Sequence, residues 1–260
     1  VNNVCGSGLK CINMAAAMIE AGEADIIVAG GMESMSNIPY VLENMRWGAR
    51  MNDVKAKDAM VLDGLWCPEN DVHMAVIGGQ VAAEYNVTRE MQDAWAYRSQ
   101  KLWAEGEGQE KFDDERFAVE VPGPKGKVTV VEKDEAPRPS TTMEGLAKLP
   151  PLFVKDGTVT AGNAPGTNDG ASAIVLMSRE KAAELGAPIL ASIKGYAQAS
   201  RESRYIATVP GLAIQNLMEK NHLTVKDFDL IEINEAFAAV PLVSCLGILG
   251  MSEQEMDAKV

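Results

Sequence analysis

Cys5 has the surroundings of a reactive thiol. It ends a short apolar stretch and directly precedes a Gly-Ser-Gly sequence and an Ala-, Met- and Ile-rich segment, 9–21, that predicts a helix. A thiol at a helix N-terminus lies beside unpaired N–H groups and the positive end of the helix dipole, which favour the thiolate. The glycines permit the sharp strand-to-helix turn that exposes a nucleophile. We predict that Cys5 is a nucleophile; the alternative, a small buried hydrophobic residue, is our interpretation of Cys11.

The segments around Cys5 predict an α/β fold. Residues 25–29 form an apolar run that ends in two glycines, and 171–177 form another; such runs are typical of sheet strands covered on both faces. Helices are expected beside them, over 9–21 and 178–185. Later in the chain we predict two further strands, a helix and a buried helix, over 189–197, 229–233, 211–220 and 236–251 respectively.

The middle of the chain, residues 37–167, has a different composition. It is polar, rich in Met and Trp, and contains many loop-forming residues. One helix is predicted over 71–85, and a second begins at Thr88, whose hydroxyl suits an N-cap. The pattern therefore predicts an α/β layer, a long insertion and a second α/β layer.

Composition excludes several classes of function. The 260 residues carry 24 Lys+Arg and 37 Asp+Glu, a formal net charge of −13, which argues against binding to nucleic acid or to an anionic membrane surface. The longest apolar stretch, 236–251, is shorter than the ~18 residues of a membrane span. Four cysteines are too few for a disulfide framework, so a reducing cytoplasm is expected. We find no metal-ligand spacing and no dinucleotide fingerprint, and expect neither a metal nor a nicotinamide.

Five ordered motifs resemble those of the thiolase family. The histidine in one of them is typical of the biosynthetic branch, which forms acetoacetyl-CoA. The five are Asn3-Val4-Cys5-Gly6-Ser7-Gly8-Leu9, Ala29-Gly30-Gly31-Met32-Glu33-Ser34-Met35-Ser36, His73-Met74 after Asp63-Gly64-Leu65, Gly157-Thr158-Val159-Thr160-Ala161-Gly162-Asn163-Ala164 with Asn168-Asp169-Gly170, and Asn234-Glu235-Ala236-Phe237-Ala238.

The resemblance implies a layered α-β-α-β-α fold with an inserted loop domain. Residues 1–36 and 168–188 would form part of an N-terminal α/β domain, 37–167 the loop domain, and 189–260 part of a C-terminal α/β domain. Homodimers or homotetramers are expected. A basic stretch between Arg46 and Lys57 would be the loop that joins two dimers, although by itself it fits a solvated loop equally well.

The implied activity is acyl transfer through an acyl-cysteine. Cys5 would take an acetyl group from acetyl-CoA, and a second acetyl-CoA would give acetoacetyl-CoA, or the reverse thiolysis would occur. Asn234 would help to stabilise the enolate, in the family through a bound water, and the Cys5 N–H would serve a second oxyanion site. The coenzyme A thioester is then the substrate, and no cofactor is bound permanently.

Seven other residues match positions at which the family contacts its substrate. Arg138 would meet the nucleotide end of coenzyme A, because its phosphates need local positive charge on an acidic protein. From the residues alone, His73 fits equally well a loop histidine bonded to the backbone, and Asn234 a turn residue. The six residues other than Arg138 would pack the pantetheine and the short acyl group, although some of them also fit plain core residues. They are Leu65, His73, Met74, Phe153, Ala161 and Phe237.

Two features depart from the family. Pro165 stands where most members have a small polar residue, and proline supplies neither a hydroxyl nor an N–H to the pantetheine. The family's Gly-His-Pro histidine and Cys-x-Gly cysteine would lie beyond Val260, while His222 and Cys245 match neither motif. The chain therefore resembles a central segment of a thiolase.

Three alternatives to a biosynthetic thiolase are left open by the sequence. One is a degradative 3-ketoacyl-CoA thiolase, which His73 argues against. Another is a non-catalytic superfamily member that binds acyl-CoA or lipid. A cysteine peptidase built from Cys5 and His73 is the least favoured, because the other motifs have no place in one.

Overall fold

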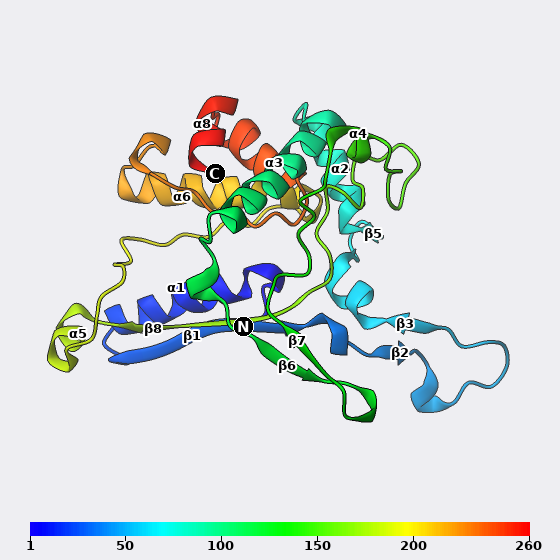
Figure 1. The fold of residues 1–260 in the computed structure, drawn as a ribbon, viewed down its shortest axis with the longest axis horizontal. Coiled ribbons are helices and arrows are strands. Elements are labelled where there is room, and N and C mark those ends of the chain that lie inside the picture. The colour runs from blue at the N-terminus through cyan, green and yellow to red at the C-terminus, as the bar shows by residue number, and fades with distance from the viewer.

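The computed structural model describes residues 1–260, in which helices and strands are mixed as predicted. A two-stranded sheet carries helix α1 on one face, and most other helices lie beyond α1 (Figure 1). The helices are α1 (Ser7–Glu20), α2 (Met74–Glu84), α3 (Arg89–Gly108), α4 (Met143–Ala147), α5 (Arg179–Leu185), α6 (Val209–Asn221), α7 (Ala239–Leu242) and α8 (Glu253–Lys259). The strands are β1 (Ile26–Ser34), β2 (Tyr40–Leu42), β3 (Ala56–Asp58), β4 (Trp66–Cys67), β5 (Val72–His73), β6 (Val119–Pro122), β7 (Val128–Val131) and β8 (Asp169–Met177).

The sheet pairs β1 with β8, which are far apart in the sequence. The strands are antiparallel, with Ile26 opposite Met177 and Ser34 opposite Asp169. Alternation along β1 turns Ala29 toward α1, where it is buried in a small core of Ala15, Ala16, Ala29 and Leu176. The prediction of a strand covered on both faces is wrong for this chain, because side chains on the opposite face are exposed. There, Val28 is 69% and Met32 is 77% exposed.

The main hydrophobic core lies among the helices. Its 17 buried residues come chiefly from α2, α3, α7 and the π-helical turn Val243–Ile248 that continues α7, and they include Ile77, Val81, Trp95 and Cys245. The predicted buried helix over 236–251 is thus present as α7 and this turn. None of the helices is both long and apolar enough to cross a lipid bilayer.

Local helix signals are confirmed. The Thr88 hydroxyl accepts a hydrogen bond from the Met91 N–H at 3.2 Å and begins α3. Ser178 caps α5 in the same way, and Gly186 ends it in the left-handed region, at φ 62°. Each signal depends on side chains within four residues, so the sequence alone predicts it.

Two predicted strands are absent. Residues 189–197 and 229–233 have no strand structure and belong to no sheet. Both segments have strand-like composition, but a strand also needs a neighbour with which to exchange backbone hydrogen bonds, and these 260 residues offer none. The stretch before Cys5 is likewise no strand: Val4–Gly6 form a single 3₁₀ turn that leads into α1.

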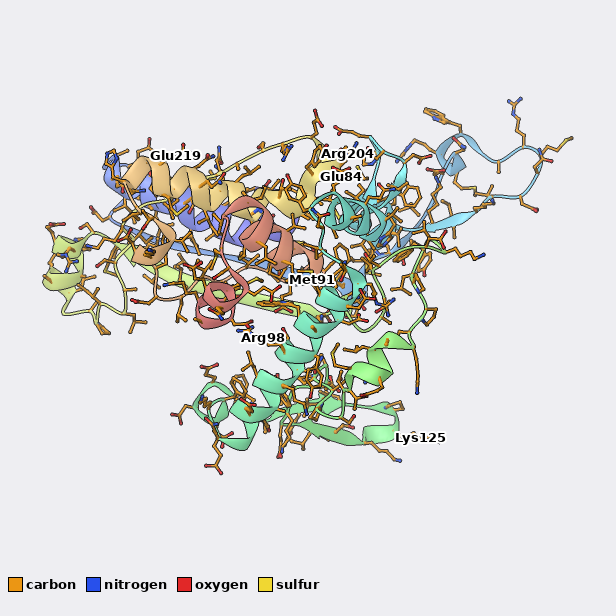
Figure 2. The ribbon with its side chains drawn as sticks, turned by 90° about the horizontal axis from the view of Figure 1, so that it is seen from above. Glu84, Met91, Arg98, Lys125, Arg204 and Glu219 are labelled. Atoms are coloured by element: carbon orange, nitrogen blue, oxygen red, sulfur yellow. The ribbon has the colours of Figure 1, made fainter.

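Three short hairpins complete the middle of the chain. They pair β2 with β3, β4 with β5, and β6 with β7. The β2–β3 hairpin extends away from the helices (Figure 1), and Lys125 marks the far end of the β6–β7 hairpin (Figure 2). The division of the chain into three domains remains a prediction.

Candidate active site

Cys5 lies at an elbow that leads into α1. It is exposed, in a turn whose following residue, Gly6, is the N-cap of α1. The Ser7 hydroxyl holds the turn: it accepts from the Asn3 N–H at 2.8 Å and donates to the Val4 carbonyl at 2.7 Å. The predicted presentation of the thiol at the start of a helix is therefore what the structure has, apart from the strand expected before it.

The backbone at the elbow is strained. Val4 has φ 50°, a left-handed conformation that is costly for a β-branched residue. One turn later, Gly8 lies against the backbone of Gly31 in β1, and a Cβ on Gly31 would come within 3.2 Å of the Gly8 Cα. The glycines thus permit close approach of helix and strand, and the strain at Val4 sits next to the candidate nucleophile.

His73 and Phe153 meet face to face. Their ring centroids are 3.9 Å apart, and the planes are inclined by 14°. His73 Nδ1 accepts the Ala75 N–H at 3.1 Å, so the imidazole caps α2. Phe153 is exposed and has φ 68°, a second strained residue among the predicted site residues. Two of the predicted substrate contacts are therefore in direct contact with each other.

The β4–β5 hairpin places the residues next to His73. Trp66 pairs with His73 across the hairpin, so Leu65 stands directly before the pair and Met74 directly after it. Leu65 ends a π-helical turn and is partly buried, as is Met74 at the first position of α2. These two predicted contacts thus flank the stacked histidine.

Phe237 packs on the same helix. Its ring lies so close to Gly78 of α2 that a Cβ there would approach Phe237 Cδ2 to 3.1 Å. Asn234 is exposed, and its side chain makes no hydrogen bond within the chain. The adjacent Glu235 is anchored instead: its Oε1 accepts from Trp95 Nε1 at 3.1 Å and from the Ser99 hydroxyl at 2.7 Å, both on α3.

Ala161 belongs to a loop that is held from beneath. It is exposed, whereas the neighbouring Thr160 and Asn163 are buried. Asn163 Oδ1 accepts the Thr160 N–H at 2.8 Å, and its backbone carbonyl accepts the Ala238 N–H at 3.0 Å. The loop of Ala161 is thereby joined to the segment 234–238.

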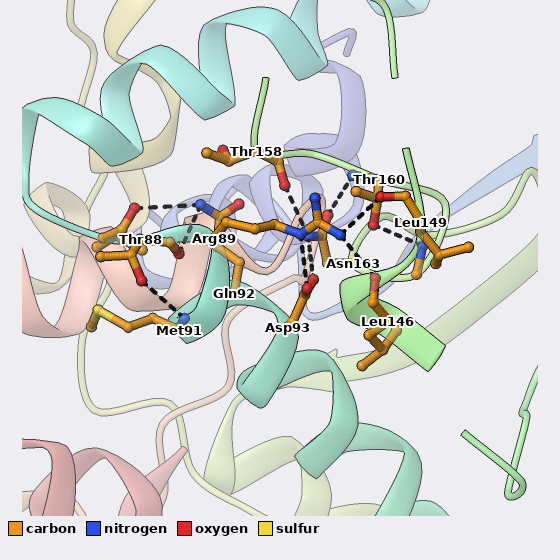
Figure 3. Close-up of polar contacts among 12 residues, drawn as sticks. Thr88, Arg89, Met91, Gln92, Asp93, Leu146, Leu149, Thr158, Thr160 and Asn163 are labelled. Atoms are coloured by element: carbon orange, nitrogen blue, oxygen red, sulfur yellow. Dashed lines mark hydrogen bonds and ion pairs between the residues drawn. The ribbon is translucent and has the colours of Figure 1, made fainter. Parts of the chain in front are cut away.

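Beneath this loop lies a polar network on α3 (Figure 3). Asp93 Oδ1 accepts from Asn163 Nδ2 at 2.9 Å, and Asp93 Oδ2 from Arg89 Nε at 2.8 Å. Arg89 also donates to the carbonyls of Leu146 and Leu149, at 2.9 and 3.1 Å. Sequence reasoning missed Arg89 and Asp93. Their i, i+4 spacing is a weak signal, because such pairs usually lie on exposed helix faces.

Arg138 lies apart from these contacts. It is exposed, and its guanidinium forms no ion pair. Its backbone N–H donates to Gln100 Oε1 of α3 at 2.7 Å. No hydrogen bond joins Cys5 to any of the other predicted residues. The structure thus brings His73, Phe153 and their neighbours together around α2 and α3, and leaves Cys5 and Arg138 on separate elements.

The remaining cysteines are poor candidates for the nucleophile. Cys245 is fully buried, and burial raises its thiol pKa to about 11. Cys67 is also buried; burial raises its pKa, but hydrogen bonds from Asn70 and Ser203 outweigh that effect and lower it. Cys11 lies within α1, partly buried. Cys5 alone is exposed.

Known families account for nearly the whole chain. Residues 1–180 match the family described as thiolase, N-terminal domain, and residues 187–259 match thiolase, C-terminal domain. The chain belongs to the thiolase family. Cys5 and helix α1 lie within the part of the chain that matches the N-terminal domain.

This thiolase chain is similar over nearly its whole length to other proteins of known name. It is 47% identical over 243 residues to an acetyl-CoA acetyltransferase of Pseudomonas aeruginosa, matching 93% of this chain and 62% of the relative. A solved acetyl-CoA acetyltransferase of Bacillus anthracis superposes with a TM-score of 0.90 at 38% identity, covering 100% of this chain and 66% of the other. Human mitochondrial 3-ketoacyl-CoA thiolase also gives 0.90, at 34% identity, covering 100% and 65%. The predicted thiolase fold is confirmed, and the chain spans about 62% of the length of its first relatives.

The cap formed by His73 predicts a pH-dependent stability. Burial lowers the His73 pKa from 6.5, and protonation would remove the acceptor for the Ala75 N–H. The folded state therefore favours the neutral ring: its contribution is complete above the unfolded pKa and is lost as the pH falls below about 6.5. We expect the melting temperature to fall between pH 7.5 and pH 5 by more than in a His73→Asn variant, which keeps a capping oxygen but does not titrate. An equal fall in melting temperature for both proteins across this pH range would contradict the prediction.

Proposed function

We propose that the protein is an acetyl-CoA C-acetyltransferase, acting through an acetyl-cysteine on Cys5. The observation that carries the proposal is the exposed thiol at the α1 elbow, in a chain 47% identical to a relative named acetyl-CoA acetyltransferase. No other cysteine is exposed. Because the chain spans about 62% of that relative, the activity is proposed for the full-length protein that contains these residues.

In the first half-reaction, the Cys5 sulfur attacks the thioester carbonyl of acetyl-CoA. The thiol loses its proton, the new S–C bond forms, and the bond to the coenzyme A sulfur breaks, so that coenzyme A leaves as a thiol after taking up a proton. The N–H groups at the start of α1 favour the negative charge that develops on the carbonyl oxygen during the attack. The proton acceptor is assigned to none of these 260 residues.

In the second half-reaction, the methyl group of another acetyl-CoA loses a proton. The resulting carbon attacks the acetyl-cysteine carbonyl, the S–C bond breaks, and acetoacetyl-CoA leaves while Cys5 regains a proton. Negative charge collects on the thioester oxygen meanwhile, and we assign its stabilisation to the Asn234 amide, directly or through water. Support comes from the exposure of Asn234 and from its free amide.

The pantetheine is proposed to lie along the first turns of α2 and the loop of Ala161. The stacked rings of His73 and Phe153, with Phe237 packed against Gly78 of α2, offer an apolar surface. Arg138 is free to meet a phosphate of the nucleotide. Met74 and Leu65, on either side of the β4–β5 pair, would limit the length of the acyl group.

The test is mass spectrometry of the full-length protein after brief exposure to acetyl-CoA. A peptide containing Cys5 should gain one acetyl group, about 42 Da. A non-catalytic acyl-CoA-binding protein would bind coenzyme A and gain no mass. Likeness to the human 3-ketoacyl-CoA thiolase supports a second candidate, thiolysis of longer 3-ketoacyl chains. Rates measured against substrates of increasing chain length separate the two, and a maximum at acetoacetyl-CoA supports the first.

We further propose that the protein forms homotetramers from two dimers, joined by the loop between β2 and β3. Trp47 and Met51 on this loop are 87% and 85% exposed, and apolar side chains so exposed on a projecting loop are typical of an interface. Deleting residues 46–57 is expected to leave a dimer, measured by light scattering. A Trp47→Ala, Met51→Ala variant tests the same contact without shortening the loop. A tetramer that persists in both variants would refute the role of the loop.

We place the protein in the cytoplasm. All four cysteines are free, which fits a reducing compartment. Acetyl-CoA would then be its partner as a diffusing substrate, with no nucleic acid or membrane surface involved.

A further inference from the structure

Asp93 is a buried carboxylate on α3, in the polar network beneath the loop of Ala161. It is only 3% exposed, and each of its oxygens has a different partner: Arg89 on one side and Asn163 on the other. A buried charge is costly unless it is paired and hydrogen-bonded, and Asp93 meets both conditions. Only a carboxylate accepts on both sides, because an amide at this position would turn a donor toward one of two donors.

Asn163 connects Asp93 to two segments of the site, the loop of Ala161 and the segment 234–238. Its Nδ2 donates to Asp93 and to the Thr158 carbonyl, at 2.9 and 3.0 Å, so both amide hydrogens are used. Its backbone carbonyl accepts the Ala238 N–H at 3.0 Å. Through a single residue, the loop of Ala161 is therefore bonded both to Asp93, as Figure 3 shows, and to the segment 234–238.

The segment 234–238 has a second attachment to the same helix. Glu235 is held by Trp95 and Ser99, which follow Asp93 along α3. Asn234 itself has no side-chain bond, so its position follows from the two attachments of the segment: Glu235 directly after it and Ala238 at the end. Cys5, by contrast, is at the α1 elbow and shares no hydrogen bond with this network.

We propose that Asp93 is a positioning residue for the second half-reaction. It acts through Asn163 to set where the Asn234 amide stands relative to the enolate, and it has no part in the acylation of Cys5. The proposal rests on the function proposed above. A small displacement of a positioned group can lower a rate about a hundredfold.

The experiment compares the two half-reactions in the full-length Asp93→Asn variant. The variant keeps the size of the side chain but places an amide hydrogen against Arg89 or Asn163. The rate of Cys5 acetylation, followed by rapid quench and mass spectrometry, should remain within about twofold of the parent. Condensation of the acetylated enzyme with acetyl-CoA should slow about tenfold to a hundredfold, in kcat more than in KM.

Asp257→Asn is the matched control. It removes a carboxylate from another α3 arginine, since Asp257 Oδ1 lies 3.3 Å from Arg98 Nε, but it touches neither Asn163 nor the site. Both half-reactions should keep the parent rates. If Asp93→Asn does not fold, Asn163→Ser, which leaves the Arg89–Asp93 pair intact, carries the same test.

Each outcome bears on either the positioning role or the proposed function. A parent protein that never acetylates Cys5 overturns the proposed function. A parent that does, with a variant that slows both half-reactions equally or neither, overturns the positioning role of Asp93. Selective loss of condensation supports it.

Discussion

Cys5→Ala is expected to abolish acetylation and to leave the fold intact. Alanine has no nucleophile, so the acyl-enzyme cannot form, and the overall rate should fall by more than about a thousandfold. The side chain is exposed and packs in no core, so its removal should change the melting temperature little. The measurements are the mass of the Cys5 peptide after exposure to acetyl-CoA and the steady-state rate of acetoacetyl-CoA cleavage.

Cys11→Ala is the control for Cys5→Ala. Cys11 lies within α1, beyond the elbow, and is partly buried against the core that α1 shares with the sheet. Its removal should cost some stability but preserve acetylation. An adduct that persists in Cys5→Ala and disappears in Cys11→Ala would move the nucleophile from the elbow into the helix and contradict the mechanism proposed for Cys5.

How far the sequence predicts this fold depends on the range of the interactions. The starts of α3 and α5 were predictable because Thr88 and Ser178 bond N–H groups three residues away. The strands predicted at 189–197 and 229–233 are absent, because their composition is strand-like but a ladder needs a partner elsewhere. The pairing of β1 with β8 joins residues far apart in the sequence, and no local pattern specifies such a partner.

The residues of the site also differ in whether local sequence or tertiary packing determines their role. Cys5 was indicated by its neighbours, and residues such as His73 and Phe237 by motifs. The stacking of His73 on Phe153 and the burial of Asp93 depend on how α2, α3 and the loops pack, and these were not foreseeable. The i, i+4 spacing of Arg89 and Asp93 is typical of an exposed pair, whereas in the structure Asp93 is buried and bonded to Asn163 in the loop of Ala161. The groups that contact substrate are thus easier to predict from sequence than those that hold them in place.

Asn234→Ala is expected to slow condensation while Cys5 is acetylated at the normal rate. The amide is proposed to stabilise the enolate, and loss of one oxyanion donor of this kind costs about a hundredfold to a thousandfold in kcat. The acyl-enzyme should therefore accumulate, which mass spectrometry would detect as a long-lived acetyl adduct. Because the Asn234 side chain is exposed and makes no hydrogen bond within the chain, the fold loses nothing when it is removed.

The lack of internal bonds makes Asn234 a sharper test than its neighbour Glu235, whose loss would also free Trp95 and Ser99. Glu232→Ala, an exposed change two residues before Asn234, is the control and should leave both half-reactions unchanged. If Asn234→Ala condensed acetyl-CoA at the parent rate, the enolate would have to be stabilised by another group. If it lost acetylation as well, Asn234 would serve the Cys5 step instead, and the separation of the two half-reactions between the α1 elbow and the segment 234–238 would be wrong.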